Sequence, residues 1–294
     1  SSQMGQYIPD DFAGRVVIDL CDVDSAKFEA YADAGQRRWI NRREGRLLAT
    51  EEMRLANRAH TTLFISDSEA ALFRSRLDGS EEINVRALGN GIDAEFFDSA
   101  HVPVQPDLEE GEGPQLLFTG QMDYPPNVAG AEWMIENVMP ELRKMHDRAR
   151  FHIAGRAPVA SLRNRHGEDG VRVWGEVPDV RPFLKSADLV VAPLLIARGV
   201  QNKVLEAMAM AKAVVLTPGA ATGIEAQDDV HFAVAHPDAP EMLRRIATLL
   251  ADEGTRAEMG RAARDFVLAN MSWDSVHIEL ERLLVSGDTG RDAA

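Results

Sequence analysis

Cysteine is almost absent from this chain, since Cys21 is the single example among 294 residues. One cysteine excludes an internal disulfide and fits a reducing cytoplasm. Long apolar runs are lacking as well, because none reaches the roughly 18–20 residues that a membrane-spanning helix needs. No signal peptide is recognisable at the N-terminus. These absences predict a cytoplasmic protein without a transmembrane helix.

Positive charge is also scarce. The chain has 32 lysine and arginine residues against 47 aspartates and glutamates, which gives a formal net charge of −15 at pH 7. This balance argues against nucleic acid as a partner, because phosphate contacts need a clustered basic surface. The sequence contains neither a P-loop nor zinc-ligand spacing. Asp22 and Asp24 form an acidic pair without further ligands nearby, so we predict no metal site.

Strand-like and helix-like segments alternate along the chain, which predicts α/β architecture with parallel sheets. The length allows two domains. We place the first domain at residues 1–98. Its predicted strands are 15–20, 62–66 and 83–88, and its predicted helices are 25–34, 36–58 and 68–77. Three strands are too few for a doubly wound sheet, so we interpret this domain as lacking a first half of on the order of 100 residues.

Residues 99–114 are rich in proline, glycine and acidic residues, a composition typical of an interdomain linker. A second domain follows at 115–271, and its six predicted strands make one complete doubly wound domain. These strands are 116–119, 150–154, 171–174, 189–192, 213–216 and 231–235. Helices are predicted at 127–146, 240–251 and 253–270. Residues 272–294 are predicted to form a last helix and a polar tail.

The segment Arg198–Ala209 carries the clearest functional pattern. A short apolar strand ends at Pro193 before it, and the residues after Val204 favour a helix. A glycine turn that opens a helix presents backbone N–H groups to an anion such as phosphate. Lys203 and Glu206 share one face of that helix, so they suit the diphosphate and the ribose hydroxyls of a nucleotide. The alternative is a solvated ion pair.

More turns follow the other predicted strands, at the carboxyl edge of the sheet where open α/β folds bind ligands. Glycine in such a turn lets a ligand approach the backbone closely. Asn127 is predicted to cap the helix that follows Gly120. For each turn, a plain connection between strand and helix is the alternative. The candidate binding residues, including those of the glycine turn, are Gly120, Gln121, Gly155, Arg156, Gly199, Val200, Gln201 and Asn202.

The segment Arg198–Ala209 resembles the donor-site signature of GT-B glycosyltransferases of the retaining, family 4 type. That signature has two glutamates, the second within a Leu-Glu-Ala-Met-Ala stretch. Glu206 matches the second, which in the family holds the ribose of the nucleotide sugar, and Arg198 occupies the position of the first. The arginine that commonly follows the family's glycine is replaced by Gln121, and no lysine follows. Charge neutralisation then falls to Lys203, to Arg198 and to helix N-termini.

Two patterns, Gly-x-Met-Asp-Tyr-x-x-Asn at 120–127 and Arg-Gly-Val-Gln-Asn-Lys-Val-Leu-Glu-Ala-Met-Ala at 198–209, are similar to those of bacterial sugar transferases associated with exopolysaccharide and PEP-CTERM/exosortase loci. This resemblance implies a GT-B fold with two Rossmann-like domains. It places the nucleobase at Val177 and returns the last helix to the first domain. It also implies metal-independent sugar transfer, with retention, from a UDP- or GDP-sugar to a glycan or lipid-linked acceptor.

The predicted helix at 36–58 contains a cluster of seven arginines, the first at Arg37 and the last at Arg58. Trp39 and Ile40 lie beside them. Clustered arginine in an acidic chain favours contact with a membrane surface or a lipid diphosphate. A solvated helix face paired with glutamates is the alternative. The first interpretation predicts a protein peripheral to the inner face of the membrane.

These observations predict a hexosyltransferase-type glycosyltransferase of exopolysaccharide or cell-envelope glycan synthesis. Lys203, Glu206 and Arg198 would act on a nucleotide sugar that is substrate rather than cofactor. One alternative is a sugar-nucleotide-binding module without activity, which Arg198, Gln121 and the short first domain favour. Another is a sugar-nucleotide epimerase, which would need no acceptor.

Overall fold

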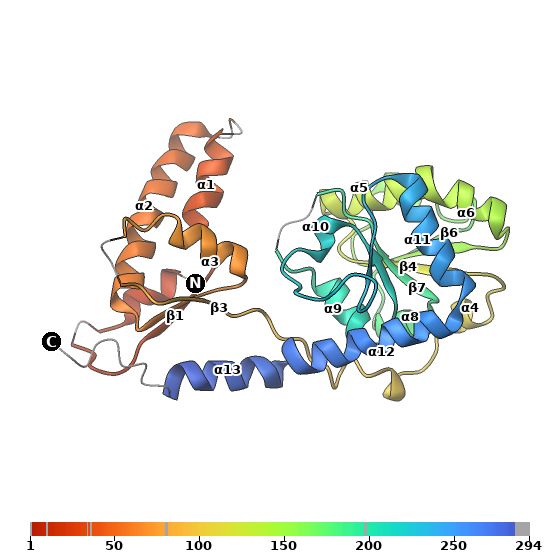
Figure 1. Cartoon of the computed structure of the whole chain (residues 1–294). Helices are drawn as coiled ribbons and strands as arrows, with labels where there is room; N and C mark the ends of the chain where they lie inside the picture. The colour runs from red at the N-terminus through yellow and green to blue at the C-terminus, as the bar shows by residue number, and fades with distance from the viewer. Residues whose placement is uncertain are drawn as a thin grey trace. The chain divides into compact units, whose positions relative to one another are not determined.

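The structure is a computed structural model that describes residues 2–9, 11–33, 35, 37–79, 82–196 and 199–285. The chain divides into two compact units (Figure 1). Unit 1 comprises Ser1–Asn90 together with Asp274–Ala294, and unit 2 comprises Gly91–Trp273. Each unit has its own apolar core. This is the two-domain α/β architecture that the alternation of segments predicts.

Unit 1 is built on a parallel sheet with the strand order β1-β2-β3. Each observed strand boundary lies within two residues of the predicted one. This sheet has fewer strands than the sheet of unit 2. The core of unit 1 packs around Leu55, Phe64 and Phe73. The elements of unit 1 are η1 (Ser2–Tyr7), β1 (Val17–Cys21), α1 (Asp24–Asp33), α2 (Arg38–Arg58), β2 (Thr61–Phe64), α3 (Asp67–Arg74), β3 (Val85–Ala87) and α13 (Trp273–Val285).

Unit 2 begins with η2 (Ser99–His101) and α4 (Pro106–Glu109), and six strands with their helices follow. The strands are β4 (Gln115–Thr119), β5 (Arg150–Ala154), β6 (Val171–Gly175), β7 (Leu189–Ala192), β8 (Val214–Leu216) and β9 (Ala233–Val234). The helices between and after them are α5 (Pro125–Trp133), η3 (Met134–Val138), α6 (Met139–Met145), α7 (Ala160–Arg163), α8 (Arg181–Ser186), α9 (Asn202–Ala209), α10 (Pro218–Ala221), α11 (Ala239–Ala251) and α12 (Glu253–Asn270).

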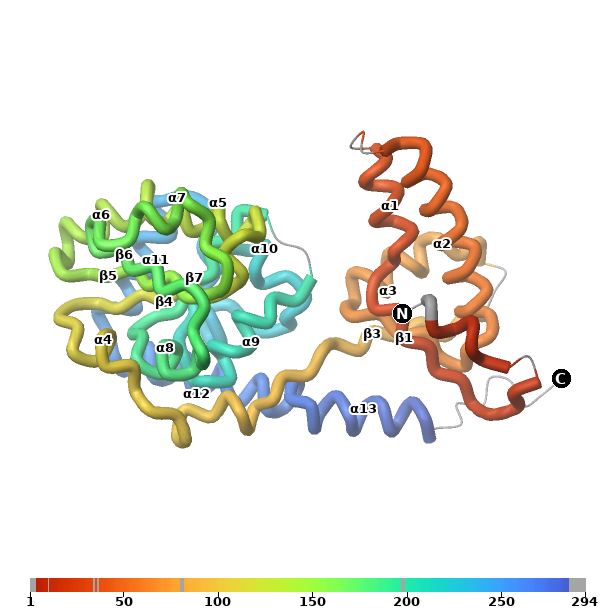
Figure 2. The backbone as a smooth tube through the Cα atoms, turned by 180° about the vertical axis from the view of Figure 1, so that it is seen from behind, coloured from red at the N-terminus to blue at the C-terminus, as the bar shows by residue number. Residues whose placement is uncertain are grey.

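All six strands of unit 2 are parallel, in the order β6-β5-β4-β7-β8-β9. Counted within the unit, this is the 3-2-1-4-5-6 order of a doubly wound Rossmann fold. Helices α5, α6 and α11 lie on one side of the sheet and α8, α9 and α12 on the other (Figure 2). Every residue of β4 and β7 is therefore buried, which explains why β7 is a continuous apolar run and why β4 has polar residues only at its two ends.

The helix predicted at 127–146 differs from the observed one in two ways. It starts at Pro125, and a π turn, η3, interrupts it before α6. Pro140 has no backbone N–H and its ring crowds the preceding turn, so the helix widens just before it instead of ending. Asn127 is not the N-cap, because that position belongs to Tyr124.

The predicted linker at 99–114 is part of unit 2. Val102 and Leu108 are buried in its core. Lys185 Nζ donates to the Val102 carbonyl at 2.6 Å, and Gln105 N donates to Ser186 Oγ at 2.8 Å. Two apolar anchors thus outweigh the acidic composition of the segment. The boundaries between the units fall after Asn90 and after Trp273, instead of at the predicted 98 and 271.

In the part of the chain that the structure describes, no helix combines the length and the apolar character needed to cross a bilayer. Nor does any group of three His, Cys, Asp or Glu side chains within the described ranges have the arrangement of a metal site.

A buried histidine joins three strands of unit 2. Trp174 donates its ring N–H to His152 Nδ1 at 3.0 Å, which leaves the histidine proton on Nε2. That nitrogen lies 2.8 Å from Gln115 Oε1, and Gln115 Nε2 donates to the Gly113 carbonyl at 2.7 Å. His152 is 1% exposed, and its burial lowers its pKa from 6.5 to about 4. The fold therefore holds a neutral imidazole.

We expect unit 2 to lose stability between about pH 6.5 and pH 4. In that window the unfolded chain protonates His152 while the folded chain does not, which favours unfolding by up to about 3 kcal/mol at pH 4. Urea unfolding at pH 7, 5.5 and 4.5 measures this loss. His152→Gln should be less stable at pH 7 but lose less on acidification. An identical acid loss in the variant would contradict the prediction.

Candidate functional site

The candidate site lies at the carboxyl ends of β4 and β7. These strands are neighbours in the sheet, but the chain leaves them toward opposite sides, which is the switch point where such folds bind ligands. A cavity of about 480 Å³ opens there. That volume falls in the range of small-molecule sites.

Most of the residues predicted from the sequence line this cavity. They are Gly120, Gln121, Gly155, Arg156, Val177, Val200, Asn202, Lys203 and Glu206. Gly199 and Gln201 lie in the turn before α9 but not in the lining, and Gln201 Nε2 donates to the Gly199 carbonyl at 3.2 Å. Arg198 falls outside the described residues. The predicted turns after β4, β5, β6 and β7 therefore meet at one cavity.

Four lining residues were not predicted: Thr119, Ala154, Glu176 and Val180. Thr119 is the last residue of β4 and is 4% exposed, and its hydroxyl has no hydrogen-bond partner in the described part of the chain. A buried hydroxyl without a partner is rare, so it is a candidate ligand contact. Its place directly before Gly120 is the signal by which the sequence could have revealed it.

Two glycines allow the turns after β4 and β5 to touch. A Cβ built on Gly155 would lie 1.6 Å from the Gly120 carbonyl oxygen, so no other residue fits there. Gly155 N donates to the Gly175 carbonyl at 2.8 Å, which joins the turn after β5 to the end of β6. This close approach of backbones forms the floor of the cavity.

Lys203 reaches the cavity from the first turn of α9. Its ammonium donates to Asn127 Oδ1 at 2.5 Å and lies 5.1 Å from the centre of the Phe118 ring. Burial lowers the pKa of Lys203 to about 8, and the nearby Glu206 opposes that shift. Burial raises the pKa of Glu206, and Lys203 opposes that shift in turn. Each charge is therefore poorly solvated and available to a ligand.

Arg156 provides a second cation at the mouth of the cavity. Its Nη2 donates to Gln121 Oε1 at 2.6 Å. Gln121 stands where the resemblance places an arginine. Arg156, in the turn after β5, therefore brings a guanidinium close to the position at which that arginine is missing. The start of α9 adds backbone N–H groups without intrahelical acceptors. Together these groups suit an anion such as a diphosphate.

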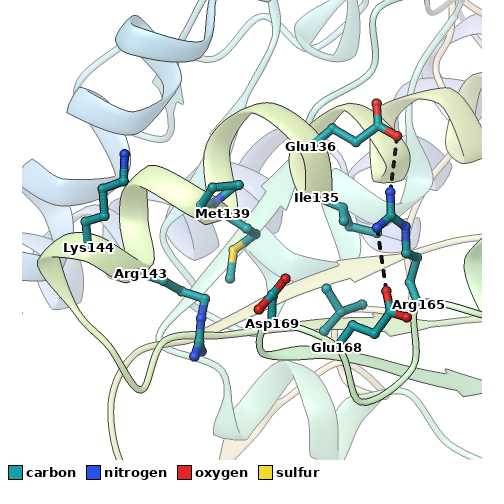
Figure 3. A pocket seen from close by; sticks show the side chains of 10 residues that line it. Ile135, Glu136, Met139, Arg143, Lys144, Arg165, Glu168 and Asp169 are labelled. Atoms are coloured by element: carbon teal, nitrogen blue, oxygen red, sulfur yellow. Dashed lines mark hydrogen bonds and ion pairs between the residues drawn. The ribbon is translucent and has the colours of Figure 1, made fainter.

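A second cavity, of about 530 Å³, lies beside Val171, at the start of β6 and so at the opposite edge of the sheet. Figure 3 shows Arg165 directed at two acidic side chains in it. Its guanidinium lies 3.4 Å from Glu136 and 3.5 Å from Glu168. These two acids compensate the charge of Arg165, so that cation is already paired within the protein.

Residues 113–252, from the start of β4 to the end of α11, match the family model described as glycosyl transferases group 1. The matched region contains all six strands of unit 2. The match confirms the predicted enzyme class. No curated protein sequence matches the chain.

Solved structures show that the chain has the GT-B fold of known glycosyltransferases. Sucrose-phosphate synthase from Thermosynechococcus elongatus is 17% identical, with a TM-score of 0.68 over 96% of this chain and 70% of its own. HepE from Anabaena in complex with UDP and glucose is 16% identical, with a TM-score of 0.65 over 92% and 72%. A glycosyltransferase from Rickettsia africae is 16% identical, with a TM-score of 0.59 over 77% and 64%.

Gly155→Ala tests the close approach at the floor of the cavity. The added methyl group would meet the Gly120 carbonyl, so we expect a loss of about 3 kcal/mol or more in the free energy of unfolding. Gly167→Ala is the control, because Gly167 also has a positive φ but no atom within 4 Å of its Cβ position. That variant should lose about 1 kcal/mol. Equal losses in urea unfolding would contradict the role of Gly155.

Proposed function

We propose that this protein transfers a sugar from a nucleoside diphosphate sugar to a hydroxyl acceptor, with retention and without metal. Two findings that concern the same region support this proposal. The region that matches glycosyl transferases group 1 contains the cavity at the switch point, and that cavity is lined by Lys203 and Glu206. UDP is the favoured nucleotide, because the similar structures of HepE were solved with UDP and with UDP-glucose.

The chemistry follows from the charges around the cavity. Breaking the bond between the sugar and the diphosphate places growing negative charge on the leaving phosphate. The Lys203 ammonium, the Arg156 guanidinium and the N–H groups that open α9 would stabilise that charge. Glu206, whose carboxylate makes no hydrogen bond within the described ranges, would accept the two ribose hydroxyls. Val177 would contact the nucleobase.

The acceptor is proposed to be a glycan or a lipid-linked sugar of exopolysaccharide or cell-envelope synthesis. This proposal is supported by the resemblance at 120–127 and 198–209. A module that binds the nucleotide sugar without transferring it is the second candidate, because Gln121 replaces an arginine of the family. Turnover of a nucleotide sugar with an acceptor would exclude that candidate.

Nucleotide binding tests the donor site directly. In calorimetric titrations with UDP, GDP and ADP, we expect one diphosphate to bind. Glu206→Gln should weaken that binding about tenfold or more, because it removes charge-assisted hydrogen bonds to the ribose. Glu168→Gln, which changes a glutamate of the second cavity, is the matched control and should bind as the native protein does. Absence of binding by all three nucleotides would refute the donor site.

We also propose that α2 contacts an anionic membrane surface that carries the acceptor. Asn41, Gly45 and Glu52 are buried on one side of this helix. Trp39, Arg43 and Leu47 follow one another at intervals of one turn on the opposite side of the helix. Trp39 is 76% exposed and Leu47 is 51% exposed. The helix carries six arginines against three glutamates in a chain of net charge −15. An apolar and basic face suits anionic lipid.

Sedimentation with phosphatidylcholine vesicles, with and without phosphatidylserine, tests this contact. We expect binding that requires phosphatidylserine, and about tenfold weaker binding by Trp39→Ala/Arg43→Glu. Arg165→Glu, a charge reversal in unit 2, is the control and should retain binding. Equal binding by native protein and double variant would contradict the proposal, and so would absence of binding by the native protein.

A further inference from the structure

A buried asparagine controls the direction of the Lys203 side chain. Asn127 Oδ1 accepts from the Lys203 ammonium at 2.5 Å, and Asn127 Nδ2 donates to the Gln121 carbonyl at 2.9 Å. Both ends of this amide are therefore engaged. Asn127 is 4% exposed and belongs to the first turn of α5. The turn after β4 fixes the orientation of the amide, and the amide fixes the ammonium.

The space around Gly120 shows how tightly these groups pack. A Cβ on Gly120 would lie 2.9 Å from Asn127 Nδ2 and 3.1 Å from Lys203 Nζ. The lysine acceptor is thus Asn127, on another helix and 76 positions away, although Glu206 follows one turn later on α9. Lysine and glutamate at that spacing ordinarily pair with each other.

We propose that Asn127 is a positioning residue, which holds the Lys203 ammonium over Gly120 and away from Glu206. An amide oxygen orients an ammonium without neutralising it, whereas a carboxylate does both. Lys203 therefore keeps its charge for a diphosphate. Glu206 stays open to ribose hydroxyls. The part of this inference that concerns the diphosphate rests on the proposed function, and the part that concerns the lysine does not.

The lysine can be observed without any nucleotide. The chain has only five lysines, so ¹³C-labelled lysine gives few NMR signals, and the one lost in Lys203→Arg identifies Lys203. In Asn127→Ala the ammonium loses its acceptor, so we expect its titration midpoint to fall by about one pH unit or more. Asn127→Asp keeps the shape and adds a carboxylate, so its midpoint should rise by a similar amount.

Asn137→Ala is the matched control. Asn137 belongs to η3, is exposed, and donates to the Trp133 carbonyl at 3.0 Å, so its loss should leave the Lys203 midpoint unchanged. An unchanged midpoint in both Asn127 variants would overturn the inference. A shift in Asn137→Ala equal to that in Asn127→Ala would overturn it too, because the effect would then be a general one of helix disruption.

Nucleotide affinity at pH 7.5 gives the second readout. UDP should bind about tenfold more weakly to Asn127→Ala, which loses orientation and part of the charge, and to Asn127→Asp, which neutralises the charge. Shifted midpoints with unchanged UDP affinity would overturn the role toward a diphosphate. If the native protein binds no nucleotide, the proposed function fails, while the lysine titration still decides whether Asn127 positions Lys203.

Discussion

The contact between the backbones after β4 and β5 is the constraint on which the cavity at the switch point depends. The missing side chain of Gly155 lets one turn rest on the carbonyl of Gly120, and both glycines line the cavity at the carboxyl edge of the sheet. Helix α9 can then extend Lys203 and Glu206 over that edge. A larger residue in either turn would fill the volume that a ligand needs.

Burial acts on both charged residues of the cavity in the direction that favours their neutral forms. The pKa of Lys203 falls and that of Glu206 rises, and in each case the partner charge compensates only in part. A diphosphate beside the lysine and hydroxyls beside the glutamate would reverse both effects. The binding energy of such a ligand therefore includes the relief of two poorly solvated charges, which adds to its direct contacts.

The sequence predicted the strands of both units well, because buried parallel strands are short apolar runs between turns. It also brought most candidate residues to one cavity, since strand ends in a parallel sheet share an edge. The sequence misjudged residues 99–114 as a linker, because their polar composition gives no sign that Leu108 is buried. It also misjudged Asn127, whose partner Lys203 is 76 residues away. Both errors concern tertiary contacts, which local pattern does not contain.

The two units differ in how the chain supplies them. Unit 2 is one continuous stretch, Gly91–Trp273, whereas unit 1 takes α13 from beyond it. Within unit 1, Arg15 Nε donates to the Leu283 carbonyl at 2.8 Å, a bond between positions 268 residues apart. During synthesis, all residues of unit 2 are therefore polymerised before unit 1 can acquire its last helix. Unit 1 can therefore finish folding only after the whole of unit 2 has been synthesised.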